Sequence, residues 1–426
     1  MPTQIGKYHL RRLLGEGASG KVYLALDTFS GEDVALKVID QERLRDPKLG
    51  EATRGQFMSE ASLAGKLAHP HIVSIFEAVM QDDTGYVAME YVPGGSLLNF
   101  TPPENLLPVE DVVQIGFKSC SALDYAFRKG IVHRDLKPAN ILIVDGENAN
   151  IKVADFGAAL LQAGGETTQR RIVGTPGYMS PEQVTGGALT LHSDMYAMGV
   201  VLYELLTGRR PFIASDLAEL FEKIKHREPV RPSAIRAAVP ERLDPILLRL
   251  LSKRPEDRYP TWADLGLEIA QVGKLSVYQR GIPDSEKFGI LRSSAFFQHI
   301  NDAQVWELVQ ASRWSRLPAG HAILREDEPG QSLFYLAAGN VKVTKRGRLL
   351  NALKAGECFG EMAYIRGGAE LRQATVESMA DVVIAEFDKD AMARMSEACR
   401  LEIAHGLLRL LAERLALANE RVAQTA

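Results

Sequence analysis

Two short polar segments constrain this chain more than any other feature of its sequence. Residues 133–140 read HRDLKPAN, and Asp155, fifteen residues after Asn140, begins the tripeptide DFG. The first segment places a carboxylate, an ammonium and an amide on one loop, and the second adds a carboxylate next to a glycine turn. These groups are suited to holding the metal ions of a nucleoside triphosphate and to orienting a hydroxyl toward its γ-phosphate.

A glycine-rich segment near the N-terminus offers a second phosphate-binding element. In the sequence GEGASGKV, Gly15, Gly17 and Gly20 lack side chains that would keep backbone amides away from phosphate oxygens. The same spacing marks dinucleotide-binding folds, and Asp40 stands near the place of their ribose-binding acid. Such a fold needs a helix directly after the last glycine, whereas residues 21–26 have the pattern of a strand, so this alternative is disfavoured.

In combination the motifs resemble the protein kinases, in particular bacterial Ser/Thr kinases of the eukaryotic type. The strand-like segment VALK ends in Lys37, which matches the lysine that contacts the α- and β-phosphates in that family. The resemblance runs from about Tyr8 to Ala270. It implies a bilobal fold, with a sheet-rich lobe before a helical one, that uses ATP and Mg²⁺ to phosphorylate serine or threonine in a protein substrate.

The resemblance assigns a role to each residue of the two polar segments. Asp135 would orient the substrate hydroxyl and accept its proton, and Lys137 would neutralise the γ-phosphate. Asn140 and Asp155 would ligate Mg²⁺, and Asp194 would steady the loop from a helix behind it. A pseudokinase scaffold is disfavoured because no catalytic position is lost.

The expected nucleotide site joins the glycine-rich segment to strand and hinge residues. An ion pair with a helix glutamate would hold Lys37, and Glu60 is the candidate, in a helix predicted near residues 56–67. Apolar side chains would enclose the adenine, and backbone groups of the hinge residues Glu90 and Val92 would read its edge. The expected ATP-binding residues are Gly15, Gly17, Gly20, Val22, Ala35, Lys37, Glu60, Glu90, Val92 and Leu142.

The segment GTPGYMSPE resembles the substrate-docking end of a kinase activation segment. Thr175 would contact the catalytic aspartate there, and Ser180 replaces a commoner alanine, a change that we expect to be mild. Upstream, Thr167 and Thr168 are the expected sites of autophosphorylation. A phosphate at either residue would order the segment through charge-assisted hydrogen bonds to Arg134.

After about residue 290 the pattern changes to short strands separated by glycines, which predicts an antiparallel barrel or jelly roll. Within it, the segments FGEMA and RQATV resemble the phosphate-binding cassette of cyclic nucleotide-binding domains. The resemblance implies that Arg372 pairs with the cyclic phosphate and that Glu361 accepts from the ribose 2′-hydroxyl. The expected ligand-binding residues are Gly360, Glu361, Met362, Ala363, Arg372, Gln373 and Ala374.

Two interpretations of this second domain stay open. Either cAMP or cGMP binds it and regulates the kinase, or Glu361 and Arg372 form a salt bridge in a ligand-free interaction module. The terminal helix carries an apolar stripe that would pack on its own domain or form a homodimer. The stripe consists of Leu401, Ala404, Leu408, Leu411, Leu415 and Ala418.

The predicted fold class is α+β, a bilobal kinase fold followed by an antiparallel β-barrel with flanking helices. A chain of 426 residues has room for two or three domains. The predicted boundaries are residues 8–271 for the kinase domain, 272–290 for a linker, and 291–426 for the cyclic nucleotide-binding-like domain with its terminal helix.

Composition narrows the classes of partner. A net charge of −4 gives no attraction to nucleic acid or to an anionic membrane. No segment reaches the roughly 18 apolar residues of a membrane span, and the first residues lack the apolar stretch of a signal peptide. The three cysteines lie far apart, which favours free thiols in a reducing cytoplasm. We therefore expect a cytoplasmic protein whose partners are a protein substrate and a cyclic nucleotide.

Overall fold

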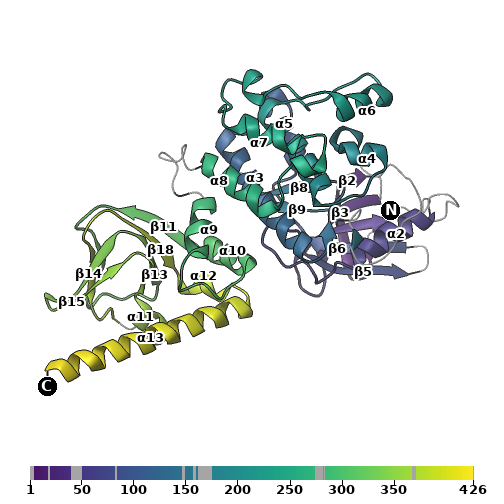
Figure 1. Ribbon diagram of the computed structural model, residues 1–426. Coiled ribbons are helices and arrows are strands. Elements are labelled where there is room, and N and C mark those ends of the chain that lie inside the picture. Colours follow the sequence, from purple (N-terminus) through teal and green to yellow (C-terminus); the bar gives the residue numbers. More distant parts are fainter. Residues whose placement is uncertain are drawn as a thin grey trace. The chain divides into compact units, whose positions relative to one another are not determined.

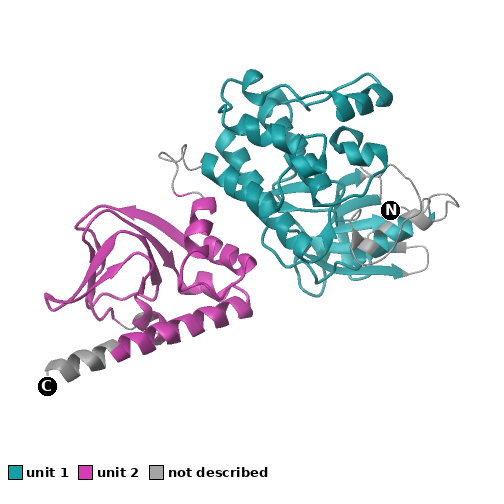
Figure 2. Cartoon of the chain, viewed as in Figure 1, with its two compact units in different colours: residues 1–275 teal, residues 276–426 magenta. Residues whose placement is uncertain are grey.

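The computed structural model describes residues 4–17, 20–39, 50–81, 84–145, 149–156, 160–161, 175–273, 282, 284–366 and 371–425. The chain forms two compact units, Met1–Leu275 and Ser276–Ala426 (Figures 1 and 2). Each unit has a hydrophobic core of its own.

Unit 1 begins with an antiparallel sheet of six strands in the order β1-β2-β3-β4-β6-β5 (Figure 1). The strands are β1 (Gln4–Ile5), β2 (Tyr8–Gly17), β3 (Gly20–Asp27), β4 (Asp33–Ile39), β5 (Ile75–Gln81) and β6 (Thr84–Glu90). Tyr8, Ala25 and Leu36 are buried in a core on this sheet. Because side chains alternate along a strand, the opposite face is left for the residues of the candidate site.

Helix α2 (Gly50–Ala61) corrects the helix predicted near residues 56–67. The helix ends earlier because single turns follow it, and Gly65 adopts a left-handed conformation at φ +71°. The apolar residues of α2 are also hardly segregated onto one side of the helix. Phe57 is buried against the sheet, while its apolar neighbour Met58 is 61% exposed. Where apolar residues lack a regular helical spacing, the ends of a helix cannot be predicted from the sequence.

The rest of unit 1 is mainly helical, around a core to which α3, α5 and α8 contribute. The helices are α3 (Val109–Arg128), α4 (Pro181–Thr185), α5 (Leu191–Thr207), α6 (Leu217–His226), α7 (Leu243–Leu250) and α8 (Trp262–Gly273). Four short strands accompany them: β7 (Ile131–Val132), β8 (Ile141–Asp145), β9 (Asn150–Val153) and β10 (Leu160–Leu161). Both polar segments of the sequence lie next to these strands, so paired backbone holds the ends of each loop.

Unit 2 contains two antiparallel sheets of four strands, β11-β18-β13-β16 and β12-β17-β14-β15. The strands are β11 (Ser312–Leu317), β12 (Ala322–Leu324), β13 (Leu333–Ala338), β14 (Asn340–Lys345), β15 (Arg348–Lys354), β16 (Cys358–Phe359), β17 (Thr375–Ser378) and β18 (Val382–Phe387). Side chains of both sheets share one core, as the predicted barrel requires.

Helices flank these sheets (Figure 1). They are α9 (Asp284–Arg292), α10 (Asp302–Ala311), α11 (Glu361–Arg366), α12 (Lys389–Ala393) and α13 (Glu397–Thr425). Helix α9 occupies the end of the segment expected as a linker, and its Phe288 ring packs against Trp306 at 4.9 Å between centroids. None of the helices in the described part of the chain combines the length and hydropathy that a bilayer span requires.

Candidate active site and ligand-binding cavity

The buried ammonium of Lys37 connects strand β4 with helix α2 and with the loop after β9. Lys37 on β4 is 6% exposed, and its Nζ donates to Glu60 Oε2 on α2 and to Asp155 Oδ1, each at 2.8 Å. Burial favours the neutral amine, but the two carboxylates outweigh it and raise the pKa of Lys37 above its ordinary value. Burial raises the pKa of Glu60 despite Lys37, whereas for Asp155 the attraction of Lys37 overcomes burial and lowers the pKa.

The other expected nucleotide-binding residues lie close by in the sheet. Val22 pairs with Lys37 across β3 and β4, and Ala35 stands two residues before Lys37, so the three side chains share one face. Val92 is buried in a cluster against which Leu142 packs. The side chain of Glu90, the predicted hinge residue, is anchored by Lys152 Nζ at 3.0 Å and by the backbone N–H of Ser74 at 3.2 Å.

The glycine-rich segment contributes the end of β2 and the start of β3. Gly15 pairs with Val22 and Gly17 with Gly20, with bulges in the register before them. Gly20 has φ +145°, and a Cβ atom there would lie 2.1 Å from the carbonyl oxygen of Val38. A glycine is therefore required at this position by the backbone itself as well as by any phosphate.

The predicted catalytic loop, residues 133–140, brings Asp135 against the start of the predicted docking segment. Asp135 Oδ2 accepts from Lys137 Nζ at 2.6 Å, and Asp135 Oδ1 accepts from the backbone N–H of Thr175 at 3.2 Å. Lys137 Nζ also donates to Thr175 Oγ1 at 3.2 Å. The Asn140 side-chain amide donates to the backbone carbonyl of Asp135 at 2.8 Å, which ties the two ends of the loop together.

Asp194 on α5 holds this loop from behind, as the sequence predicted. Its carboxylate accepts the backbone N–H groups of His133 and Arg134, each at 2.7 Å. Burial raises the pKa of Asp194, although these donors and nearby cations oppose the shift. Arg134 and Asp155 adopt left-handed backbone at φ +70° and +60°, so the protein fixes strained conformations at both polar segments.

Asn140 and Asp155 have donor atoms suited to Mg²⁺. The amide nitrogen of Asn140 is used within the loop, which leaves its Oδ1 as an acceptor. Only Oδ1 of Asp155 contacts Lys37, and the side chain is 36% exposed. One carboxylate and one amide oxygen suit a cation that takes most of its remaining ligands from phosphate and water.

The two predicted phosphorylation sites, Thr167 and Thr168, lie outside the described residues, as does Gly157 of the DFG tripeptide. Thr175, at the end of the same segment, is described and contacts Asp135 as given above. Downstream, Glu182 forms two hydrogen bonds with Arg258, at 2.7 and 2.9 Å. Arg258 is 1% exposed, so this pair anchors the docking segment to the helical core.

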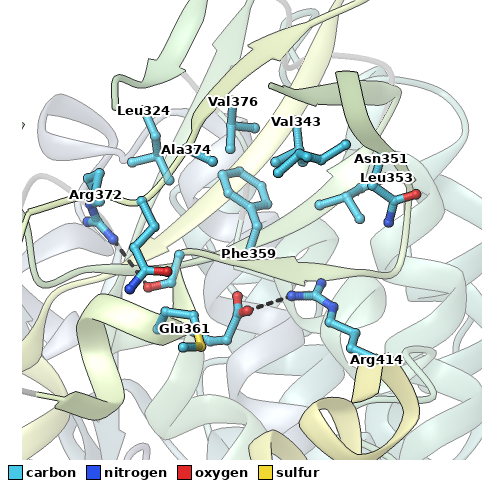
Figure 3. Close-up of a pocket in the computed structure, with 14 residues that line it drawn as sticks. Leu324, Val343, Asn351, Leu353, Phe359, Glu361, Arg372, Ala374, Val376 and Arg414 are labelled. Carbon is cyan, nitrogen blue, oxygen red and sulfur yellow. Dashed lines mark hydrogen bonds and ion pairs between the residues drawn. The ribbon is translucent and has the colours of Figure 1, made fainter. Parts of the chain in front are cut away.

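A cavity of about 260 Å³ opens in unit 2 between the predicted cassette and the sheet β12-β17-β14-β15 (Figure 3). All predicted cassette residues line it except Ala363, whose side chain lies outside the described residues. The remaining lining residues are Leu324, Val343, Leu350, Asn351, Leu353, Phe359, Val376 and Arg414. The wall is mainly apolar, with charged groups gathered at the cassette.

Arg372 is buried beside this cavity without a carboxylate partner among the described residues. Its Nη1 donates to the carbonyls of Ser332 at 3.1 Å and Gly360 at 3.2 Å, which leaves Nε and Nη2 for other acceptors. Burial lowers the pKa of Arg372. Gly360 has φ +79°, and a Cβ there would crowd both Ser332 and Arg372, so glycine lets the backbone approach the guanidinium.

Glu361 pairs with a residue that the sequence did not single out. Its Oε1 accepts from Arg414 Nη1 of α13 at 2.6 Å, and Arg414 Nη2 donates to the carbonyl of Cys358 at 2.6 Å. The alternative salt bridge between Glu361 and Arg372 is not formed among the described contacts. Arg414 lies in the long terminal helix, where no local motif marks an arginine as part of a site.

Comparison with known proteins supports both resemblances. Residues 8–265 match the family model described as the protein kinase domain, and residues 314–399 match the cyclic nucleotide-binding domain. The chain is 34% identical over 302 residues to the serine/threonine-protein kinase PknB of Mycobacterium leprae. That match covers 69% of this chain and 48% of the relative.

Two further relatives give the same result. Identity to PknB of Mycobacterium tuberculosis is 34% over 298 residues, 68% of this chain and 47% of that protein. Identity to the serine/threonine-protein kinase PrkC of Bacillus subtilis is 39% over 267 residues, 62% and 40% respectively. The chain thus spans about half the length of these relatives or less. Since the kinase model covers more than half of it, the chain belongs to the protein kinase family and carries a cyclic nucleotide-binding domain after the kinase domain.

Proposed function

We propose that this protein transfers the γ-phosphate of ATP to serine or threonine of a protein substrate, at a rate set by a cyclic nucleotide bound in unit 2. The observation that carries the kinase proposal is the joint geometry of Lys37, Glu60 and Asp155 with Asp135 at Thr175. A buried cation held by two carboxylates, next to a carboxylate at a peptide-docking segment, suits phosphoryl transfer by positioning and charge stabilisation.

Each residue near the nucleotide has a defined task in this proposal. Lys37 binds the α- and β-phosphates, and Glu60 fixes its ammonium. Asn140 and Asp155 hold Mg²⁺, which supplies charge neutralisation at the phosphates when it is bound.

Val22, Ala35 and Leu142 enclose the adenine, and the backbone of Glu90 and Val92 reads its edge. The glycine-rich turn covers the phosphates.

At the acceptor side, Asp135 orients the substrate hydroxyl and takes its proton as the new oxygen–phosphorus bond forms and the bond from the γ-phosphorus to the bridging oxygen breaks, releasing ADP. Lys137 lies 2.6 Å from the Asp135 carboxylate, where its charge also stabilises the departing phosphoryl group. Thr175 accepts from Lys137 Nζ through its hydroxyl and donates its backbone N–H to Asp135, and in this proposal it positions the substrate chain beside them. We expect serine and threonine to be the acceptors, since Lys137 matches the lysine of the Ser/Thr kinases.

We also propose that the kinase phosphorylates itself at Thr167, Thr168 or both. Arg134 supports this proposal, because its Nε is buried without a hydrogen-bond partner in the described part of the chain. Burial lowers the pKa of Arg134, and an anion beside it would offset that cost. A phosphothreonine supplies such an anion and would order the segment that ends at Thr175.

Arg372 favours a cyclic nucleotide over a ligand-free module in unit 2. A buried guanidinium with two free N–H directions suits the oxygens of a cyclic phosphodiester. Glu361 lies on the same cavity and accepts the ribose 2′-hydroxyl, while the apolar wall formed by Val343, Leu350 and Leu353 receives the base. Regulation then requires that the ligand bind with different affinity to the active and inactive arrangements of the protein.

The test is the initial rate of autophosphorylation with Mg²⁺ and ATP while cAMP or cGMP is titrated. We expect a saturable change in rate that Arg372→Ala abolishes and that the exposed control Arg394→Ala retains. Asp135→Asn should reduce phosphate transfer by about 10²- to 10⁴-fold without preventing ATP binding. A wild-type rate that ignores both nucleotides would favour the ligand-free module, and unchanged transfer in Asp135→Asn would refute the catalytic assignment.

Two further features of the proposal concern the protein's state in the cell. We propose a homodimer formed through α13, on which three leucines are exposed.

We also propose that the protein acts in the cytoplasm. Cys120, Cys358 and Cys399 are buried free thiols, which persist in a reducing compartment.

A further inference from the structure

The C-terminal helix reaches the ligand cavity through one charged side chain. Arg414 donates from Nη1 to the buried Glu361 carboxylate and from Nη2 to the carbonyl of Cys358, both at 2.6 Å. The guanidinium therefore clamps the two ends of the turn that leads from β16 into α11. One short bond holds the Glu361 carboxylate, and the second fixes the planar guanidinium against the backbone of the same turn.

The Glu361 carboxylate keeps one oxygen for a ligand. Only Oε1 contacts Arg414, and Oε2 makes no hydrogen bond with the described residues. Figure 3 shows Glu361 between the side chains of Arg372 and Arg414, with all three on the cavity wall. A ribose whose phosphate sits at Arg372 would thus meet Oε2 of a carboxylate that is already held in place.

Arg414 also extends the packed face of α13. The buried residues Cys399, Ile403 and Leu407 are four apart, and Arg414 follows Leu407 by seven residues, or two turns on the same face. Leu408 and Arg409, directly after Leu407, are exposed, whereas Leu410 and Leu411 are partly buried. Docking of this part of the helix therefore depends on the contact between Arg414 and Glu361 together with the partial burial of Leu410 and Leu411.

We propose that Arg414 is a positioning residue of the ligand site, which holds Glu361 for the ribose 2′-hydroxyl and so ties α13 to ligand affinity. The inference rests on the proposed function of the cavity. A buried carboxylate without its cation would be drawn toward solvent, away from the ribose. Because binding couplings are reciprocal, a ligand that needs the held carboxylate also strengthens the docking of α13.

The test compares ligands with and without the 2′-hydroxyl. Calorimetric titrations of the full chain would use cAMP, cGMP and their 2′-deoxy forms, with Arg414→Gln and the exposed neighbour Arg409→Gln as the matched control. We expect Arg414→Gln to weaken binding of the ribonucleotide about tenfold and to change binding of the deoxy form less than about twofold. Equal losses for both ligands would overturn the proposal, because Arg414 would then only shape the wall.

A second measurement needs no ligand and separates this inference from the proposed function. If the wild type binds none of the four nucleotides, the cyclic-nucleotide proposal fails on its own. Amide hydrogen exchange of α13 then tests the anchoring by Arg414. We expect backbone amides of residues 408–414 to exchange several-fold faster in Arg414→Gln than in wild type or Arg409→Gln. Unchanged exchange in Arg414→Gln would refute the role of Arg414 in holding the helix.

Discussion

At the scale of single residues, the chain places a full positive charge in its interior and surrounds it with more negative charge than one ion pair supplies. Lys37 is 6% exposed and contacts both Glu60 and Asp155. A single buried ion pair often fails to offset its own desolvation. Two carboxylates around one ammonium carry an excess of negative charge, which Mg²⁺ at Asp155 would balance. The arrangement is therefore better suited to binding than to stability.

Glu60→Gln tests this arrangement. The amide keeps the shape of the side chain but removes the charge that fixes Lys37, while Asp155 remains as a partner. We expect kcat/KM for ATP to fall by about tenfold to hundredfold, with the protein still folded. Steady-state kinetics at varied ATP would measure the change. The exposed Glu104→Gln provides the control, and a wild-type kcat/KM in Glu60→Gln would show that Lys37 needs only Asp155.

Sequence alone could identify site residues that lie close together in one motif. Asp135, Lys137 and Asn140 lie on one loop, and their types and spacing predict the contacts that the structure shows among them. Arg414 could not be found in this way. It lies 42 residues after Arg372, and only the packing of α13 brings it to Glu361. Because a charged residue in a helix is ordinarily exposed to solvent, an arginine at this position does not by itself indicate a binding site.

At the scale of elements, the loop between α2 and β5 is held by two buried histidines. The backbone N–H of His71 donates to His69 Nδ1 at 3.1 Å, and Ser121 of α3 contacts His69 Nε2 at 3.3 Å. Burial lowers the pKa of His69 to about 3, and burial also lowers the pKa of His71 well below its ordinary 6.5. Both rings are therefore neutral in the folded protein at neutral pH.

This burial predicts a loss of stability in acid. The unfolded chain binds protons at these histidines below pH 6.5, whereas the folded chain does not until about pH 3 for His69, so the free energy of unfolding falls as pH drops through that window. At pH 5 the loss from His69 is about 2 kcal/mol relative to pH 7.5. Urea unfolding at both pH values should show a smaller loss in His69→Asn, whereas the exposed His226→Asn should match wild type. An equal loss in His69→Asn and wild type would contradict this account.

Short elements show where the sequence was least informative. Ser180 seemed a mild change from alanine, yet it is fully buried and begins α4 with a capping box, in which its hydroxyl accepts from the Gln183 N–H. The Gln183 side chain accepts from the backbone N–H of Ser180 in return. The motif could have been read from the serine three residues before a glutamine. The ends of α2 could not, because that helix lacks an apolar face to give it a period.

At the scale of the whole molecule, the terminal helix carries two different faces. One face packs on unit 2 through Ile403 and Leu407. The other presents Leu401, Leu408 and Leu415, which are 54%, 64% and 64% exposed. These leucines were expected to pack on their own domain or on a partner, and the structure leaves them uncovered. Their spacing of seven residues is the period at which two helices can pack along one seam.

Leu408 lies at the middle of this seam, so its replacement by a charge tests the proposed homodimer. The wild type should have about twice the 46.8 kDa mass of one chain in light scattering at micromolar concentration. Leu408→Glu should shift the mass to that of one chain, because facing glutamates would repel each other in an apolar seam. Leu217→Glu, at another exposed leucine far from α13 in the sequence, should leave the mass unchanged. A monomeric wild type, or a dimer that persists in Leu408→Glu, would exclude this seam as the interface. If the dimer forms, α13 would take part in two processes. Its face with Arg414 would support ligand binding, and its face with Leu408 would form the dimer.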